Sequence, residues 1–305
     1  MVGAGLVGRS WAMVFARAGW TVKVFDRDPG QLALAQRRVA TDLSEQASSG
    51  LIADAAATAA RITWCDQLHD AIEGVEWVQE SLPEDVEVKR QIFLVLDAGT
   101  PPDTILASST SAIPASRFTE PLAGRARCLV AHPVNPPHLV PVVELCGTPW
   151  TAPSVVDRAH AVMSAIGQVP VVVRRELDGF VLNRLQGALL SEAMRLVDEG
   201  YITPADLDKT VSEGLGLRWS FLGPFATIEL NAPNGVVDYC ARYGDFFRRL
   251  ASEPPSPSVW NEASAQRVAA HVGAAIEDRS HEARTAWRNA RLLALARHKR
   301  EQEAK

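Results

Sequence analysis

Residues 3–8 read Gly3-Ala4-Gly5-Leu6-Val7-Gly8, and this glycine-rich run is the strongest indication of the fold. In the pattern GxGxxG the glycines allow a tight turn, a close approach of backbone to a pyrophosphate group, and close packing of a helix on a strand. A helix that begins here offers N–H groups and a favourable dipole to an anion. We therefore predict that Gly3, Gly5, Leu6, Val7 and Gly8 bind a dinucleotide. The alternative is a βα turn without a ligand.

An acidic residue at the expected distance supports the dinucleotide interpretation. Asp26 follows Gly8 by 18 residues and stands at the end of the predicted strand Thr21–Phe25. A carboxylate in this place can accept hydrogen bonds from the adenosine ribose and repels a 2′-phosphate. The sequence therefore favours NAD over NADP as the cofactor.

The order of the predicted elements indicates two domains. Short β-branched runs alternate with helical stretches up to about residue 176, which is typical of a parallel sheet covered by helices, and only helices are expected after Arg175. We predict an α/β, Rossmann-like dinucleotide-binding domain over residues 1–176 and an all-α helical domain for substrate binding and dimerisation over 177–305. The predicted strands are Thr21–Phe25, Trp77–Glu80, Thr104–Ala107, Cys128–Ala131 and Val169–Arg174, and the predicted helices include Ser10–Ala18, Pro29–Gln46 and Val86–Asp97.

The strand that should carry the glycine-rich loop is almost missing. Only Met1 and Val2 precede the loop, whereas a typical strand has roughly five to six residues. We expect a truncated first strand and a natural chain that begins upstream with β-branched residues.

Composition excludes several classes of protein. The 305 residues contain 31 Lys and Arg against 36 Asp and Glu, a net charge of −5, which argues against nucleic acid as the main partner. Charges and prolines interrupt every apolar run before the roughly 18 residues of a membrane helix. The cysteines form neither a CxxC pair nor a zinc pattern, so we expect no metal and reduced thiols. They are Cys65, Cys128, Cys146 and Cys240. With neither a membrane helix nor a signal peptide recognised, a cytoplasmic location is expected by default.

Three further segments contain polar residues that indicate catalytic chemistry. They are Ser108–Ser111, His132–Pro136 with Glu144, and Gly179–Arg184. Together with the amino-terminal loop they resemble the 3-hydroxyacyl-CoA dehydrogenase superfamily over nearly the whole chain. The strings at residues 8–12, 132–137 and 213–219 resemble most closely the branch that contains lambda-crystallin and L-gulonate 3-dehydrogenase.

The resemblance implies a role for each of these polar side chains. His132 would be the general base, because an imidazole titrates near neutral pH, and Glu144 would hold its ring and stabilise the imidazolium. Ser111 and Asn183 would donate hydrogen bonds to the reacting oxygen from the two domains. Structural alternatives exist for each residue alone: His132 could end a strand, and Ser111 and Asn183 could satisfy backbone groups near a helix start.

The resemblance also suggests cofactor and substrate contacts. Glu84 and Lys89 match positions near the nicotinamide, although their residue types alone suggest a surface helix start. Arg218 could hold a carboxylate through two parallel hydrogen bonds, which a thioester cannot reproduce; an exposed arginine or a surface ion pair is the alternative.

A small 3-hydroxy carboxylate, with L-gulonate first, is therefore the expected substrate. Carnitine is a near rival, because Trp219, Phe221 or Phe225 could face its quaternary ammonium. A short 3-hydroxyacyl-CoA is a further enzymatic alternative, and an NADH-binding structural protein is the alternative from another class. Apolar residues of the helical domain, among them Leu185, predict a homodimer.

Overall fold

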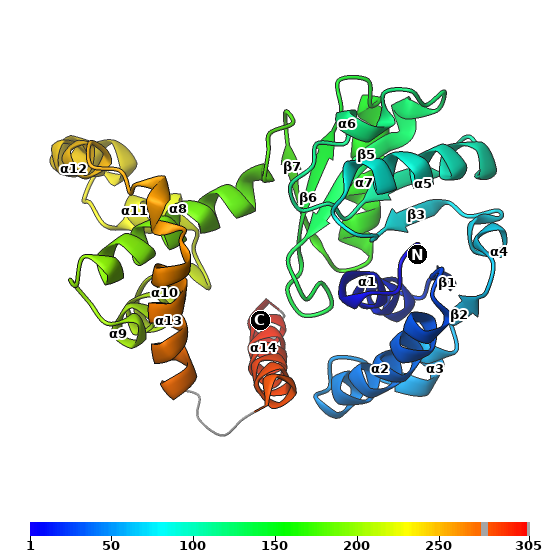
Figure 1. Cartoon of the computed structure of the whole chain (residues 1–305), viewed down its shortest axis with the longest axis horizontal. Coiled ribbons are helices and arrows are strands. Elements are labelled where there is room, and N and C mark those ends of the chain that lie inside the picture. The colour runs from blue at the N-terminus through cyan, green and yellow to red at the C-terminus, as the bar shows by residue number, and fades with distance from the viewer. Residues whose placement is uncertain (276–279, 304–305) are drawn as a thin grey trace. The chain divides into compact units, whose positions relative to one another are not determined.

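The computed structural model describes residues 1–275 and 280–303, and the chain divides into two compact units (Figure 1). Unit 1 comprises Met1–Asn183 and Glu282–Lys305, and unit 2 comprises Arg184–His281. The predicted boundary at residue 176 lies close to the first division. The last helix, α14 (His281–Glu303), is assigned to unit 1 apart from its first residue.

Unit 1 contains a mixed sheet in two pieces. One piece has the parallel order β1-β2 and the other the order β3-β4-β5-β6-β7, in which the pair β5 and β6 is antiparallel. Strands β2 and β6 were not foreseen as strands. The predicted α/β class is confirmed. The strands are β1 (Val22–Phe25), β2 (Ile62–Cys65), β3 (Trp77–Glu80), β4 (Ile105–Ser108), β5 (Cys128–Pro133), β6 (Val142–Gly147) and β7 (Val169–Val173).

Val2 joins the two pieces of the sheet. It forms parallel bridges with Phe25 of β1 and with Glu80 of β3, and Figure 1 shows the amino terminus between these two strands. The order across the join is therefore β2-β1-Val2-β3. The residues before the glycine-rich loop take the place of a central strand, but they pair along a very short length.

Helices cover the sheet of unit 1, and two apolar clusters form its core. Helix α1 (Leu6–Arg17) follows the glycine-rich loop and is almost entirely buried, with Trp11 and Phe15 at its centre. Phe93 and Phe118 pack together in the other cluster. The remaining helical elements of unit 1 are α2 (Pro29–Ser48), α3 (Ala55–Ala59), α4 (Leu68–Ile72), α5 (Val86–Gly99), α6 (Ser116–Thr119), the 3-10 turn Arg125–Arg127 and α7 (Pro153–Ala165).

The regular elements of unit 2 are all helical among its described residues. Helix α8 (Phe180–Asp198) begins in unit 1 and continues into unit 2, and it is followed by Gly200 with φ of 77°. Thr203 caps α9 (Pro204–Lys209) by accepting a hydrogen bond from the Asp206 N–H group, as its sequence suggests. The other elements are a π-helical segment (Thr210–Leu215), α10 (Gly216–Trp219), α11 (Pro224–Leu230), α12 (Gly235–Ala251), the 3-10 turn Pro257–Val259 and α13 (Glu262–Ala275).

Candidate active site

The glycine-rich loop has the shape that its pattern predicts. Gly3 has φ of 96°, and a Cβ atom there would approach the Ser81 carbonyl oxygen to 2.7 Å. A Cβ on Gly8 would approach the Gly3 carbonyl oxygen to 1.9 Å, so both positions require glycine for packing. A Cβ on Gly5 would meet nothing within 4 Å. Space beside Gly5 therefore lies open at the start of α1, where a phosphate group would bind.

The start of α1 is suited to an anion. Gly5 is the N-cap and provides no side-chain hydrogen bond, and the first turn contains no acidic residue. Leu6 and Val7 therefore present N–H groups at the positive end of the helix dipole. These observations fit the pyrophosphate of a dinucleotide.

Asp26 connects the end of β1 to this loop. Its Oδ2 atom accepts a hydrogen bond of 2.8 Å from the Ala4 N–H group, and its Oδ1 atom accepts one of 3.0 Å from Asp28. The carboxylate is thus fixed at the carboxyl edge of the strand beside the glycine-rich loop. This is the position from which a ribose could be bound.

His132 and Glu144 form a buried pair on neighbouring strands. They stand opposite each other in the antiparallel ladder of β5 and β6, so the fold brings their side chains together on one face. The His132 Nδ1 atom lies 2.8 Å from Glu144 Oε2. Within the part of the chain that the structure describes, no hydrogen bond is recorded for the other ring nitrogen, Nε2. The structure therefore brings together two residues that the sequence only related by resemblance.

The second oxygen of Glu144 holds the start of α8. Its Oε1 atom accepts hydrogen bonds of 2.9 Å from the N–H groups of Val181 and Leu182. Phe180, directly before them, has φ of 46°, an unfavourable value for a bulky residue, and its ring centroid lies 5.7 Å from that of His132. The carboxylate thus fixes both the imidazole and the helix start.

Opposing effects act on the pKa of Glu144. Burial alone raises it, but the hydrogen bonds from His132, Leu182 and Val181 favour the ionised carboxylate and hold the pKa below its usual value. Glu144 therefore stays a carboxylate near neutral pH. Its contact with Nδ1 fixes the orientation of the His132 ring.

Ser111 and Asn183 also meet in unit 1. The Asn183 Nδ2 atom donates a hydrogen bond of 2.7 Å to the Ser111 carbonyl oxygen. An amide nitrogen carries two hydrogens, so one remains available for another acceptor. Ser111 is exposed, and its hydroxyl can form a hydrogen bond with a bound molecule. The geometry is compatible with the predicted pair of donors.

Glu84 shapes the loop that contains Ser111. Its Oε1 atom accepts hydrogen bonds of 3.0 Å and 2.9 Å from the N–H groups of Ser111 and Ala112, and it also accepts one from the Thr110 hydroxyl. The side chain is 40% exposed. Glu84 therefore holds the predicted catalytic loop in addition to any contact with a cofactor.

Lys89 is buried, although the sequence alone suggests a surface helix start. Its Nζ atom lies 3.0 Å and 3.1 Å from the two carboxylate oxygens of Glu80, and 3.8 Å from Glu84. Only 1% of the Lys89 side chain is exposed. Any effect of Lys89 on a bound cofactor would therefore be exerted by way of the carboxylates of Glu80 and Glu84. A direct cofactor contact by Lys89 stays a prediction.

Sequence reasoning missed Glu80, which stands at the centre of this network. The residue is fully buried, and its carboxylate accepts hydrogen bonds from Lys89, from the Ser108 hydroxyl and from the Leu82 N–H group. The signal was present in the sequence. A carboxylate that ends a wholly buried strand needs a partner, and Lys89 was available on the next helix.

Arg218 lies in unit 2 on the short helix α10 and is exposed. Among the described residues, the structure records neither an ion pair nor a side-chain hydrogen bond for it. Its predicted contact with a carboxylate stays a prediction. The described residues also contain no cluster of His, Cys, Asp and Glu that could hold a metal ion, and no described helix is both long and apolar enough to cross a membrane.

Comparison with known proteins identifies the family. The profile of the 3-hydroxyacyl-CoA dehydrogenase NAD binding domain matches residues 1–177, and that of the C-terminal domain of the same family matches residues 179–277. A lambda-crystallin homolog of Bos taurus is 44% identical over 97% of this chain and 94% of its own length. An L-carnitine dehydrogenase of a Pseudomonas species is 32% identical over 96% of this chain and 91% of its own length.

A solved structure extends the likeness to the fold. An NAD+ dependent 5-formyl-3-hydroxy-2-methylpyridine 4-carboxylic acid 5-dehydrogenase has a TM-score of 0.84 and 28% identity, covering 100% of this chain and 97% of that one. The two-part organisation and the cofactor predicted from the sequence are thereby confirmed. The chain belongs to the 3-hydroxyacyl-CoA dehydrogenase family and is an NAD-dependent 3-hydroxy acid dehydrogenase of the lambda-crystallin branch.

Proposed function

We propose that this protein oxidises the 3-hydroxyl group of a small 3-hydroxy carboxylate, with conversion of L-gulonate to 3-dehydro-L-gulonate as its reaction. The observation that carries the proposal is the buried pair of His132 and Glu144, whose Nδ1 and Oε2 atoms lie 2.8 Å apart. An imidazole oriented in this way, with one ring nitrogen free, is equipped to remove a proton from an alcohol.

The chain's own residues supply the proton chemistry. Nε2 of His132 would take the proton of the 3-hydroxyl group while the carbon that bears this group loses a hydride. The C–H and O–H bonds are thereby replaced by a carbonyl group. NAD, when bound, accepts that hydride. The Glu144 carboxylate would stabilise the imidazolium that forms, because it already bonds Nδ1.

Ser111 and Asn183 would bind the reacting oxygen. One Asn183 N–H is used by the Ser111 carbonyl group, and the second N–H and the Ser111 hydroxyl are the proposed donors. They accelerate the reaction to the extent that they bind the developing carbonyl more strongly than the alcohol.

Gly3, Gly5, Leu6, Val7 and Gly8 would hold the pyrophosphate of NAD. Support comes from the open space beside Gly5 and from the uncapped start of α1. Asp26 would accept hydrogen bonds from the adenosine ribose and disfavour NADP. Glu84, with Lys89 behind it, would lie towards the nicotinamide end.

Carnitine is the second candidate substrate. A relative named L-carnitine dehydrogenase matches 96% of this chain, and the exposed rings of Trp219 and Phe225 in unit 2 offer faces for a quaternary ammonium. Arg218 would pair with the carboxylate that L-gulonate and carnitine share. A short 3-hydroxyacyl-CoA lacks that carboxylate and is the third candidate.

The deciding experiment measures NAD reduction at 340 nm with L-gulonate, L-carnitine and 3-hydroxybutyryl-CoA as substrates. We expect the highest kcat/KM with L-gulonate. A higher kcat/KM with carnitine or with the thioester would identify that compound as the substrate instead of L-gulonate. NADH binding without turnover of any of them would instead favour an NADH-binding structural protein.

We also propose a homodimer formed through unit 2, in a cytoplasmic location. Leu185 is 65% exposed and Val237 is 82% exposed in the single chain, and Phe246 and Phe247 are each nearly half exposed. Surfaces of this kind mark interfaces between chains. All the cysteines are free thiols, as is usual in a reducing compartment.

A further inference from the structure

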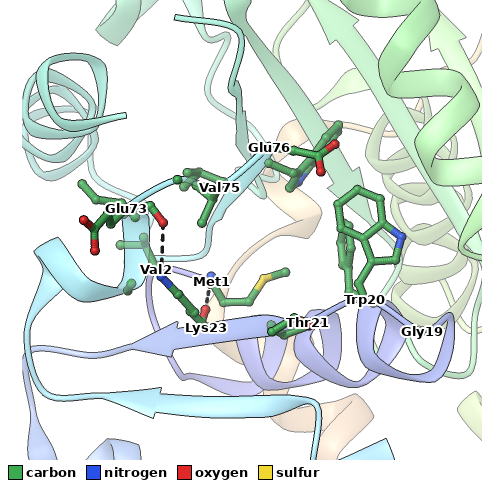
Figure 2. A pocket seen from close by; sticks show the side chains of 16 residues that line it. Met1, Val2, Gly19, Trp20, Thr21, Lys23, Glu73, Val75 and Glu76 are labelled. Carbon is green, nitrogen blue, oxygen red and sulfur yellow. Dashed lines mark hydrogen bonds between the residues drawn. The ribbon is translucent and has the colours of Figure 1, made fainter. Parts of the chain in front are cut away.

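Burial holds two titratable groups of unit 1 in their uncharged forms at neutral pH. The Met1 amino group, which Figure 2 shows with its hydrogen bond to the Lys23 carbonyl oxygen, has its pKa lowered to about 5. The His138 side chain is buried, and this burial, together with the nearby charge of Arg17, lowers the pKa of its imidazole to about 3. Of the two groups, His138 lies close in sequence to the candidate active site.

His138 belongs to the segment that joins the two strands of the buried His132 and Glu144 pair. Strand β5 ends one residue after His132, and β6 begins two residues before Glu144. We call the connecting residues 134–141 the β5–β6 loop. Its placement affects the ends of both strands, and therefore the place of the imidazole that would remove the proton.

The β5–β6 loop is bound to helix α1 at two points. The His138 Nδ1 atom lies 3.1 Å from the Ser10 hydroxyl oxygen, and the Arg17 Nη1 atom donates a hydrogen bond of 2.7 Å to the His138 carbonyl oxygen. Ser10 is fully buried, and it precedes Arg17 by about two turns of α1. Contacts this far apart fix both the place and the direction of the helix relative to the loop.

The hydrogen bonds of Ser10 determine which nitrogen of His138 carries the hydrogen. The Ser10 hydroxyl donates to the Leu6 carbonyl oxygen at 2.8 Å. A serine hydroxyl has a single hydrogen, so towards His138 it can only accept. The hydrogen of the neutral His138 ring is therefore on Nδ1. A chain of hydrogen bonds thus connects the β5–β6 loop with Leu6, the first residue of α1, whose N–H group would face the pyrophosphate.

We propose that His138 is a positioning residue for the dehydrogenase reaction, an inference that rests on the proposed function. Its hydrogen bond to Ser10 would hold α1, and with it the cofactor, in a fixed place relative to His132. The hydride and the proton leave one alcohol group, so the base and the cofactor must keep one relative placement. An error of about 1 Å can cost roughly 100-fold in rate. His138 itself would touch neither substrate nor cofactor.

The first test measures kcat, KM and the Kd for NADH, with kcat counted per NADH-binding site so that unfolded molecules do not contribute. His138→Leu removes the donor, and we expect kcat to fall by about 10-fold to 100-fold, with KM and the Kd for NADH changed by less than about threefold. Ser10→Ala removes the acceptor and should have the same effect. The two substitutions together should lower kcat no further than either alone, because they break the same hydrogen bond.

Two matched variants serve as controls. His138→Asn keeps an amide N–H group near the place of Nδ1 and should return kcat to within about threefold of the unsubstituted protein. His160→Leu, at an exposed position on α7, should leave all three quantities unchanged. A kcat of His138→Leu equal to that of the unsubstituted protein, or a kcat of His138→Asn as low as that of His138→Leu, would overturn the proposal.

A second test separates positioning from a general loss of structure. In the His132→Gln variant the base is absent, so adding His138→Leu should lower kcat by less than about threefold. The same loss with and without His132 would mean that His138 acts only on the stability of unit 1. Ser10→Ala provides the same comparison if His138→Leu does not fold. The proposed function fails on a different result, which is unchanged turnover of His132→Gln alone.

A third test needs no cofactor and no turnover. Nitrogen-15 NMR of the imidazole groups reports which ring nitrogen carries a hydrogen. We expect the hydrogen of His138 on Nδ1, with the ring uncharged, from about pH 8 down to about pH 5. A hydrogen on Nε2 would contradict the bond to Ser10, and with it the proposal.

Discussion

Unit 1 and unit 2 differ in how much of their apolar surface they bury. Unit 1 encloses Trp11, Phe15 and Phe93 almost completely. In unit 2, few of the described apolar residues are buried, whereas Leu185 and Val237 are mostly exposed. A helical layer stabilises itself by burying one face, so unit 2 has apolar surface available for a partner.

The two units also differ in the functions proposed for their residues. The residues proposed for proton transfer and NAD binding all belong to unit 1, where a closed core and buried ion pairs can fix side chains. Unit 2 contains the residue proposed for substrate selection and the surface proposed for dimerisation. We therefore expect substitutions in unit 1 to change chemistry and folding, and those in unit 2 to change specificity and assembly.

The largest expected effect tests whether unit 1 contains the chemistry. His132→Gln should lower kcat by roughly 100-fold to 10,000-fold, because general-base catalysis contributes that much, and should leave the Kd for NADH nearly unchanged. Steady-state kinetics and fluorescence titration measure the two quantities. His160→Gln, at an exposed position on α7, is the matched control. Unchanged turnover in His132→Gln would remove this residue from the mechanism.

The second prediction tests the buried network behind the loop that contains Ser111. Glu80→Gln leaves the Lys89 ammonium buried without its closest carboxylate and should lower the free energy of unfolding by roughly 3–5 kcal/mol. Urea unfolding measures this change. Glu87→Gln, on the exposed face of α5, should change it by less than about 0.5 kcal/mol. Similar values for the two variants would mean that the Glu80 pair does not hold unit 1 together.

The third prediction concerns pH and the amino terminus of unit 1. The pKa of the Met1 amino group falls from 8.0 to about 5 on folding, so between these values the unfolded chain binds a proton that the folded chain lacks. Stability should therefore fall as the pH decreases from about 8 to about 5, by at most about 4 kcal/mol. Acetylation of Met1 removes the charge and should abolish this part of the pH dependence. An identical profile after acetylation would contradict the assignment.

The fourth prediction compares the surfaces of the two units directly. Leu185→Asp in unit 2 should weaken the dimer by roughly 10-fold to 150-fold, since burial of a leucine side chain is worth about 1.5–3 kcal/mol. Leu94→Asp on α5 of unit 1, where the leucine is 42% exposed, should leave the mass unchanged. Light scattering at micromolar concentration decides between the variants. Monomeric mass of the unsubstituted protein, with activity retained, would refute the dimer.

An effect of similar size is expected for substrate selection by unit 2. Arg218→Leu should lower kcat/KM for L-gulonate or carnitine by about 10-fold to 150-fold, the equivalent of a charge-assisted hydrogen bond of roughly 1.5–3 kcal/mol. Activity on an acyl-CoA and the Kd for NADH should hardly change. Arg242→Leu, an exposed arginine paired with Asp238 on α12, is the control. Equal losses on both substrate types would indicate a structural role for Arg218.

Local sequence signals predicted several elements closely. Trp77–Glu80 was predicted as a strand with the bounds that β3 has, and helices α2 and α5 begin at the predicted residues. Asp28 and Asp85 cap these helices through side-chain hydrogen bonds, which is a local property of the chain. Signals that act over a few residues can be seen without knowledge of the fold.

Strands β2 and β6 escaped prediction because their stability comes from their neighbours. Ile62–Cys65 is a short edge strand that pairs only with β1, and Val142–Gly147 runs antiparallel to β5 within a mostly parallel sheet. Neither fact follows from periodicity within the strand itself. Pairing partners that lie far along the chain decide such elements.

The family, the α/β class, NAD as cofactor and the residue types of the proposed site could all be recognised from the sequence, because these depend on motifs of a few residues. The position of His132 opposite Glu144, and the hydrogen bonds from the start of α8 to Glu144, depend on how the chain folds in three dimensions. The buried ion pair of Glu80 and Lys89, behind the loop that contains Ser111, also became visible only in the folded chain. Such features arise where distant strands meet, and the free energy of burying charges and backbone groups there depends on the whole sheet.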